Sequence, residues 1–127
     1  MPTEVISLSR LLSEAGRLCP GITDALLVDA DGVLIETVRL DDSGVDPDEV
    51  AVEGLAAAVA VSRFSAASRL GTPSESLITG EHGVSVIRRV EGADAVVILR
   101  AGEDVLAGRV RFAARIIAGR LAPHLAG

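Results

Sequence analysis

Two aspartates in the stretch 25–38 are the residues of this sequence best suited to chemistry. Asp29 and Asp31 follow an apolar run typical of a β-strand, and Gly32 comes directly after them. Carboxylates can act as nucleophiles and as general acids or bases. The same residues also fit a turn, because Asp-Gly between two β-branched apolar runs favours a type I′ hairpin, whose two central residues need positive φ. We interpret 25–38 as a hairpin and keep the catalytic interpretation as an alternative.

The catalytic interpretation rests on a likeness to the first motif of haloacid-dehalogenase-type phosphatases, which this segment resembles. That resemblance implies that Asp29 is the nucleophile and Asp31 the acid/base. The mechanism also needs a positive residue for the phosphoryl group and further acids for Mg²⁺, normally in a parallel sheet with helices between its strands. Here the next segments predict a second hairpin strand and a meander, and lysine is absent. A tight turn explains both aspartates equally well.

Composition limits the chemistry that the chain can perform. The 127 residues predict one domain, 1–127, and the formal net charge of −6 argues against a nucleic-acid partner. Every basic residue is arginine, so a phosphate loop and a Schiff base, which both require lysine, are excluded. Cys19, His82 and His124 are too few for a metal cluster or a catalytic triad. We therefore predict a protein that is not an enzyme and has no catalytic, cofactor-binding or metal-binding residues.

Hydropathy predicts a cytoplasmic protein without membrane insertion. No apolar run approaches the roughly 18 residues of a membrane span. The N-terminal residues lack the basic region and apolar core of a secretory signal. Hydrophobic residues nevertheless make up 49% of the chain. This share favours a surface that is hidden against a partner or a second copy.

The spacing of apolar residues predicts the element order α-β-β-α-β-β-β-α. Short links between the last three strands predict a meander, which forms one five-stranded antiparallel sheet with the hairpin. Helices on both faces of this sheet give an α+β domain. Strand 75–80 is expected at an edge, and the unbroken apolar run in 95–101 is expected at the centre. The expected ranges are helices 4–18, 47–70 and 104–121, and strands within 25–38, 75–80, 84–90 and 95–101.

The long helix 47–70 has clear start and stop signals. Asp46 is the expected N-cap, Pro47 occupies the first helical position, and Gly71 is the expected C-terminal glycine. A helix that is apolar on more than one side is expected to be buried nearly all round. One face carries Val52, Leu55, Val59 and Leu70, and the other side carries Val50, Val61 and Phe64 with the small residues Gly54 and Ala57, which would let another backbone come close.

The edge strand and the long helix together predict a two-fold dimer. Strand 75–80 contains neither lysine nor proline to guard its edge. An isologous interface would cover the strand and the helix at once. The candidate contacts are Ala57, Val61, Phe64, Leu77 and Ile78.

The last helix, 104–121, combines a core stripe with an arginine face. The predicted core stripe consists of Leu106, Val110, Ala113, Ile117 and Leu121, and the helix is expected to end before Pro123. The other side carries Arg109, Arg111, Arg115 and Arg120. Such a face is either solvated or a site for an acidic partner.

The order and spacing of several short segments resemble the roadblock (dynein light-chain/roadblock) family, in particular its bacterial and archaeal, MglB-type members. The resemblance covers about residues 8–125 and rests on Pro20-Gly21-Ile22, Ala25–Val28, Asp31-Gly32, Leu55–Ala57, Leu70-Gly71, Gly83 and Leu106–Arg111. It implies a profilin-like domain that forms homodimers or heterodimers by joining third-strand edges and packing the long helices antiparallel.

The resemblance also implies a function, since roadblock proteins act as non-catalytic scaffolds or regulators of small Ras-like GTPases, in some cases as GTPase-activating partners. The candidate GTPase-facing residues are Glu49, Glu53 and Arg63, because charged side chains are rarely buried unpaired. A PAS- or GAF-like module that senses a small ligand is the alternative from another class. Such a module needs polar groups that converge within an apolar cavity.

Overall fold

The elements of the fold follow the predicted order. The computed structural model describes residues 7–125. The part of the first predicted helix at residues 4–6 lies outside the described residues. The helices are α1 (Leu8–Leu18), α2 (Pro47–Ala67) and α3 (Ala107–Leu125), and the strands are β1 (Ile22–Asp29), β2 (Leu34–Arg39), β3 (Glu75–Gly80), β4 (Gly83–Arg89) and β5 (Ala95–Gly102).

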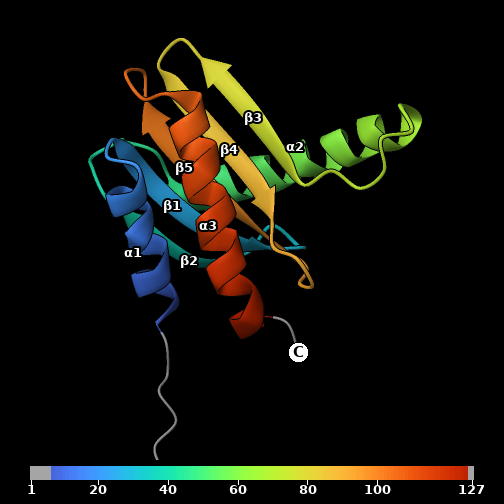
Figure 1. Cartoon of the computed structure of the whole chain (residues 1–127), viewed down its shortest axis with the longest axis horizontal. Coiled ribbons are helices and arrows are strands. Elements are labelled where there is room, and N and C mark those ends of the chain that lie inside the picture. The colour runs from blue at the N-terminus through green and yellow to red at the C-terminus, as the bar shows by residue number, and fades with distance from the viewer. Residues whose placement is uncertain (1–6, 126–127) are drawn as a thin grey trace, which may run out of the picture.

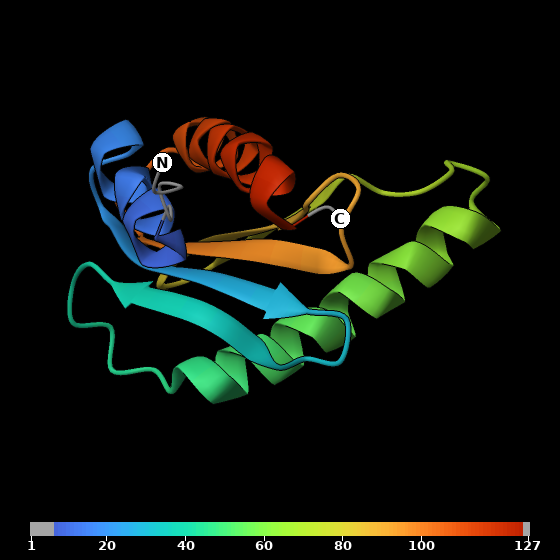
Figure 2. The same cartoon turned by 90° about the horizontal axis from the view of Figure 1, so that it is seen from below.

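The five strands form one antiparallel sheet in the order β2-β1-β5-β4-β3. The predictions of β3 at an edge and of β5 at the centre are both confirmed. Helices α1 and α3 lie side by side on one face, and α2 crosses the other face (Figures 1 and 2). The sheet is therefore covered from both sides, as predicted, but by unequal layers.

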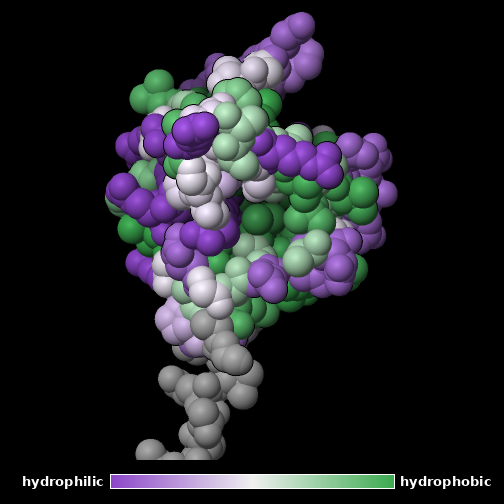
Figure 3. All heavy atoms as spheres, turned by 90° about the vertical axis from the view of Figure 1, so that its right-hand side faces the viewer, coloured by the Kyte–Doolittle hydropathy of each residue, from purple (hydrophilic) through white to green (hydrophobic). Residues whose placement is uncertain are grey.

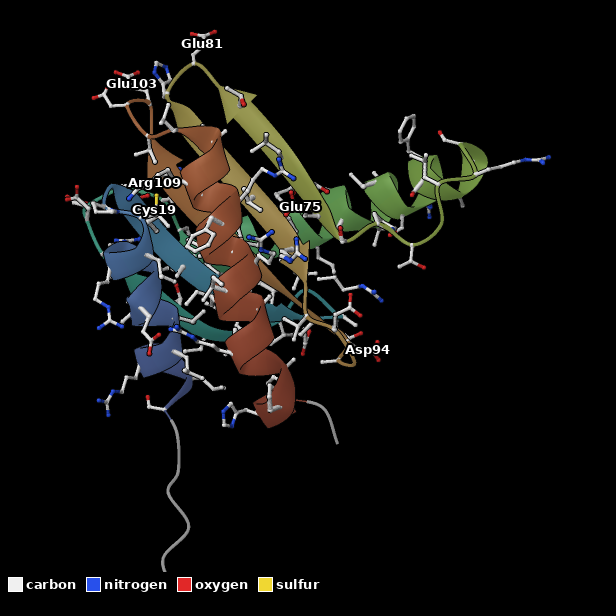
Figure 4. The ribbon with its side chains drawn as sticks, in the orientation of Figure 1. Cys19, Glu75, Glu81, Asp94, Glu103 and Arg109 are labelled. Carbon is white, nitrogen blue, oxygen red and sulfur yellow. The ribbon has the colours of Figure 1, made fainter. Side chains whose placement is uncertain are left out.

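The two faces of the sheet differ in how much they bury. The face under α1 and α3 carries the larger core, in which Leu12, Leu27, Leu99 and Ile117 are fully buried. Cys19 is buried in the same core, and burial raises the pKa of its thiol while the nearby Arg109 opposes that rise (Figure 4). The other face has a small core, which consists of Leu26, Val28, Ala51, Ile87 and Ile98.

Small residues bring α2 close to the sheet. Ala51 and Ser65 are the buried residues of α2, and a Cβ added at Gly54 would overlap the Cδ1 atom of Ile98. The small residues of α2 were predicted to let another backbone come close. Within this chain they lie against the sheet.

The hairpin is confirmed, but its predicted type I′ turn is wrong. The Gly32 N–H donates to the Asp29 carbonyl at 3.1 Å, which closes a β-turn over 29–32. Positive φ occurs at Gly32 (81°) and not at Asp31. The Asp29 carboxylate decides this geometry, because its Oδ1 atom accepts the N–H groups of Asp31 (2.9 Å) and Val33 (3.0 Å). The result matches a three-residue hairpin loop that ends in a left-handed glycine.

Helix α2 ends at Ala67, three residues before the predicted end at Leu70. The N–H of Leu70 donates to the Ser65 carbonyl and that of Arg69 donates to the Ala66 carbonyl, which is a Schellman motif. Arg69 has a φ of 57° and takes the left-handed position that was assigned to Gly71.

Both predicted ends of α3 were also wrong. Leu106 precedes the helix and is 73% exposed, so it is not part of the core stripe, while Val110 and Leu121 are buried as predicted. The helix continues through Pro123 to Leu125. Because Pro123 has no N–H, only the carbonyl of the exposed Gly119 loses its helical hydrogen bond, and water can take that place. The buried Leu121 keeps this turn packed on the core.

A buried carboxylate joins β1, β5 and the loop before α2. The Asp24 side chain is 5% exposed and accepts hydrogen bonds from Arg100 Nη1 (2.8 Å), Thr23 Oγ1 (2.8 Å) and Ser43 Oγ (3.1 Å). Arg39 Nε lies 3.7 Å from its Oδ1 atom. Both oxygens of this buried carboxylate are thus partnered.

We predict that Asp24→Ala lowers the free energy of unfolding by about 1.5–3 kcal/mol, because charged hydrogen bonds of this kind are lost together. Urea denaturation followed by circular dichroism measures this change. The matched control is Asp41→Ala, which removes an exposed carboxylate that accepts only from the adjacent Asp42 N–H and should change stability by less than about 0.5 kcal/mol. Equal stability of the two variants would refute the role of Asp24.

Candidate interaction surface

Most of α2 has no cover within one chain. Its last turns extend past the sheet (Figures 1 and 2). Phe64 is 67% exposed and Val52 is 56% exposed, and Val59 and Leu70 are exposed as well. The expectation that α2 is buried nearly all round is therefore wrong for the single chain. A view from the side toward which α2 projects shows hydrophobic surface bordered by hydrophilic side chains (Figure 3).

A membrane is one conceivable cover for this helix. By length and composition alone, α2 is apolar enough to cross a bilayer, and only 11% of its most apolar window is buried. Glu53 and Arg63 both lie within that window, and charged side chains inside a membrane are costly. Helices in soluble proteins pass the same test. The exposed side of α2 therefore suits a protein partner better than lipid.

The second uncovered element is β3, whose outer edge is open. The Arg89 N–H donates to the Ser74 carbonyl at 3.0 Å, so Ser74 points its backbone groups toward β4. Along an antiparallel pair of strands, residues that are hydrogen-bonded to the neighbouring strand alternate with residues that are not. The backbone groups of the odd-numbered residues of β3 therefore face away from β4. Leu77 is 44% exposed on the α3 side of the sheet and Ile78 is 47% exposed on the α2 side. This edge offers hydrogen bonds and apolar contacts together.

A groove of about 490 Å³ lies between α2 and two turns at one end of the sheet. Its apolar walls include Leu55, Val59 and Val96. Its charged lining residues are Asp29 and Asp94 from the turns, Arg63 from α2 and Arg89 from β4.

Three arginines gather around Glu75 on the α3 side of the sheet. We call Arg88, Arg111 and Arg115 the arginine cluster; with Glu75 and Phe112 they line a polar pocket of about 180 Å³. Arg88 Nη1 donates to Glu75 Oε1 at 2.7 Å, and Arg111 Nε donates to Glu75 Oε2. The Arg115 guanidinium lies 5.7 Å from the centre of the Phe112 ring. The predicted solvated arginine face is thus partly paired, since Arg111 binds Glu75 and Arg120 binds Glu14.

The charges around Glu75 change its proton affinity. Burial alone would raise the pKa of this carboxyl, but the hydrogen bonds and positive charges of Arg111 and Arg88 outweigh burial and lower it. Glu75 is therefore ionised at neutral pH and stabilises the fold as a carboxylate.

The predicted site residues occupy different environments. Phe64, Leu77 and Ile78 are exposed, Val61 is half-buried, and Ala57 is half-buried against its own sheet. The GTPase-facing candidates Glu49, Glu53 and Arg63 are all exposed. Val52 and Val59 are exposed as well, but they lie on the other side of α2, and Val59 lines the groove beside the two turns. The small residues Ala51, Gly54 and Ala58, which recur at helical spacing, mark the sheet-facing side.

The structure uses the two candidate catalytic aspartates differently from a phosphatase. Asp29 is committed to the turn through two backbone N–H groups, and Asp31 is exposed. The surrounding sheet is antiparallel, whereas the phosphatase motif belongs to a parallel one. Within residues 7–125, no three His, Cys, Asp or Glu side chains are placed to hold a metal ion.

Comparison with known proteins places the fold. No protein-family model and no curated protein matches the sequence. Among solved structures, the chain is similar to a Roadblock/LC7 domain from Streptomyces avermitilis, with a TM-score of 0.81, 16% identity and coverage of 94% of this chain and 98% of that one. For gliding protein MglB from Thermus thermophilus, the TM-score is 0.83 and the identity 20%, and the match covers 97% of this chain and 96% of that one. For MglC from Myxococcus xanthus, the TM-score is 0.65 and the identity 24%, and the match covers 94% of this chain and 100% of that one. The predicted roadblock fold is thereby confirmed.

We predict that Glu75→Gln lowers the free energy of unfolding by about 1–3 kcal/mol at pH 7, because two charged hydrogen bonds weaken. A carboxyl with a lowered pKa stabilises the protein above its unfolded value of about 4.3, and this stability is lost as pH falls through the folded pKa. The difference between wild type and Glu75→Gln should therefore begin to shrink near about pH 4.3 and continue to shrink as the pH falls through the folded pKa. Urea denaturation at a series of pH values measures this difference, and a gap that stays constant down to pH 3 would contradict the assignment.

Proposed function

We propose that this protein is a non-catalytic, dimeric scaffold or regulator that binds a small Ras-like GTPase. The observation that carries the proposal is the exposed apolar side of α2 beside the open edge of β3. A single chain leaves both uncovered, and one partner surface can cover both. The roadblock fold supplies the class of partner.

In the proposed dimer, the β3 strands of two copies join edge to edge and the α2 helices pack antiparallel. This arrangement gives the backbone groups of β3 hydrogen-bond partners and removes the apolar side of α2 from water. The proposed contacts are Ala57, Val61, Phe64, Leu77 and Ile78, of which Phe64, Leu77 and Ile78 are exposed in the single chain. One similar structure is MglB in a tetrameric arrangement, which supports self-association as a use of this fold.

The GTPase is proposed to bind the strip of the paired α2 helices that the dimer leaves exposed. Glu49, Glu53 and Arg63 stand on this helix as exposed charges. Charges at such positions set the orientation and the association rate of a partner more than its affinity. No arginine is assigned as a catalytic finger, because no arginine among the described residues is distinguished as one.

We predict that wild type is a dimer at micromolar concentration and that Phe64→Glu weakens association by at least about 2 kcal/mol, because a charge then enters an apolar contact. Light scattering across a dilution series measures the mass. Leu106→Glu is the matched control, since Leu106 is equally exposed but precedes α3 on the other face of the sheet, and it should stay dimeric. A monomeric wild type would refute the dimer, and an unchanged Phe64→Glu would remove that residue from the interface.

We also predict that the dimer binds a small Ras-like GTPase encoded in the same organism. The GTPase is loaded with GDP or with a non-hydrolysable GTP analogue, and the dimer is titrated into each. Different affinities for the two states support a regulator, and equal affinities support a tether. No binding by any such GTPase would refute the proposal. A small molecule that mass spectrometry finds released from the denatured protein would instead favour the sensory alternative, with the groove beside α2 as its site.

A further inference from the structure

The two ends of β3 carry opposite charge. The arginine cluster lies beside its first residue, Glu75, and the turn after its last residue carries Glu81 (Figure 4). Glu81 is exposed and makes no salt bridge among residues 7–125. The distance between these ends along the strand keeps Glu81 away from the arginine cluster of its own chain.

The arginine cluster holds more positive charge than its own chain balances. Glu75 is the only acidic side chain that lines this pocket among the described residues, against three guanidinium groups. Arg115 makes no salt bridge within the same part of the chain and rests on the ring of Phe112. In a chain with a net charge of −6, this local surplus attracts a carboxylate.

Symmetry brings the opposite ends of two β3 strands together. Two copies of one strand that pair antiparallel, edge to edge, are related by a two-fold axis. When this axis is perpendicular to the sheet, the sheet of one copy continues into the sheet of the other. The first residue of β3 then lies near the last residue of its copy. Such an axis also keeps the α3 sides of both sheets on the same side of the joined sheet.

The alternation along β3 limits how two copies of the strand can be joined. Glu75 and Leu77 lie on the α3 side, and their backbone groups face the open edge. Directly opposite residues of an antiparallel pair point to the same face, so odd-numbered residues must oppose odd-numbered residues. In a pairing centred on β3, Glu75 therefore lies opposite residue 79 or residue 81 of the copy. In both registers the turn that carries Glu81 of the copy lies next to Glu75 and the arginine cluster.

We propose that the arginine cluster is a receptor for Glu81 of a second copy of this chain. The site is incomplete in one chain, because its second carboxylate comes from the copy, and the two-fold axis makes two such sites per dimer. The inference rests on the proposed β3-joined dimer. The ion pairs favour these two central registers over longer shifts of the joined strands, which would move Glu81 away from the cluster.

The test uses two variants that are each self-repulsive. Glu81→Arg sets arginine against the cluster, and Arg115→Glu sets glutamate against Glu81. Each variant alone should dissociate at least about tenfold more readily than wild type, because like charges then meet at both sites. When the two variants are mixed, native mass spectrometry should detect mainly the heterodimer. One of its two sites keeps the wild-type pairing of Glu81 with Arg115, and the other pairs the substituted arginine with the substituted glutamate. Glu103→Arg is the control, since it reverses an exposed charge outside β3 and should dimerise like wild type.

The outcomes separate this inference from the proposed function. A dimeric wild type whose two variants dissociate no more readily, or whose mixture gives statistical amounts of the three dimers, overturns the role of Glu81 and leaves the dimer standing. A monomeric wild type overturns both. Thermal melting of each variant, compared with wild type, confirms that a weaker dimer does not reflect a damaged fold.

Discussion

Close contact between α2 and one face of the sheet is the constraint on which the rest of this structure depends. A Cβ atom at Gly54 would overlap the Cδ1 atom of Ile98 unless that side chain moved, and the nearby buried position on α2 is Ala51. Small side chains bury little apolar area, so this layer contributes much less than the layer of α1 and α3. The larger apolar residues of α2 are consequently turned outward.

The polar contacts have a complementary role. Asp24 and Glu75 are each held by two arginines, and each joins elements that are far apart in the sequence. Buried ion pairs of this kind add little net stability but disfavour arrangements that leave a charge unpaired. Asp24 orders the loop that leads into α2, and Glu75 ties β3 to α3. The carboxylates thus fix the start of the long helix and the position of the edge strand, the two elements that remain uncovered.

The elements were largely predictable because their signals are local. Asp46-Pro47 begins α2 and Asp31-Gly32 marks the hairpin, as expected. The turn type was missed because the Asp29 side chain, rather than the Asp-Gly pair, decides where positive φ falls. The open edge of β3 was predictable from its composition. The arginine cluster was not, because Glu75 and Arg111 are 36 residues apart and nothing in the spacing connects them. The outward face of α2 required the position of Ile98, which only the tertiary structure provides.

The central place of β5 also determines when the chain can fold during synthesis. Strand β1 pairs along its length with β5, about 70 residues later, whereas β2 follows it directly. Until β5 has left the ribosome, the β1–β2 hairpin has no neighbour on its other side and α2 has only part of its sheet beneath it. Long-range pairing of this kind slows folding and leaves apolar segments exposed in the meantime. The nascent chain therefore presents α2 uncovered through much of its synthesis, which makes this helix a natural binding segment for chaperones.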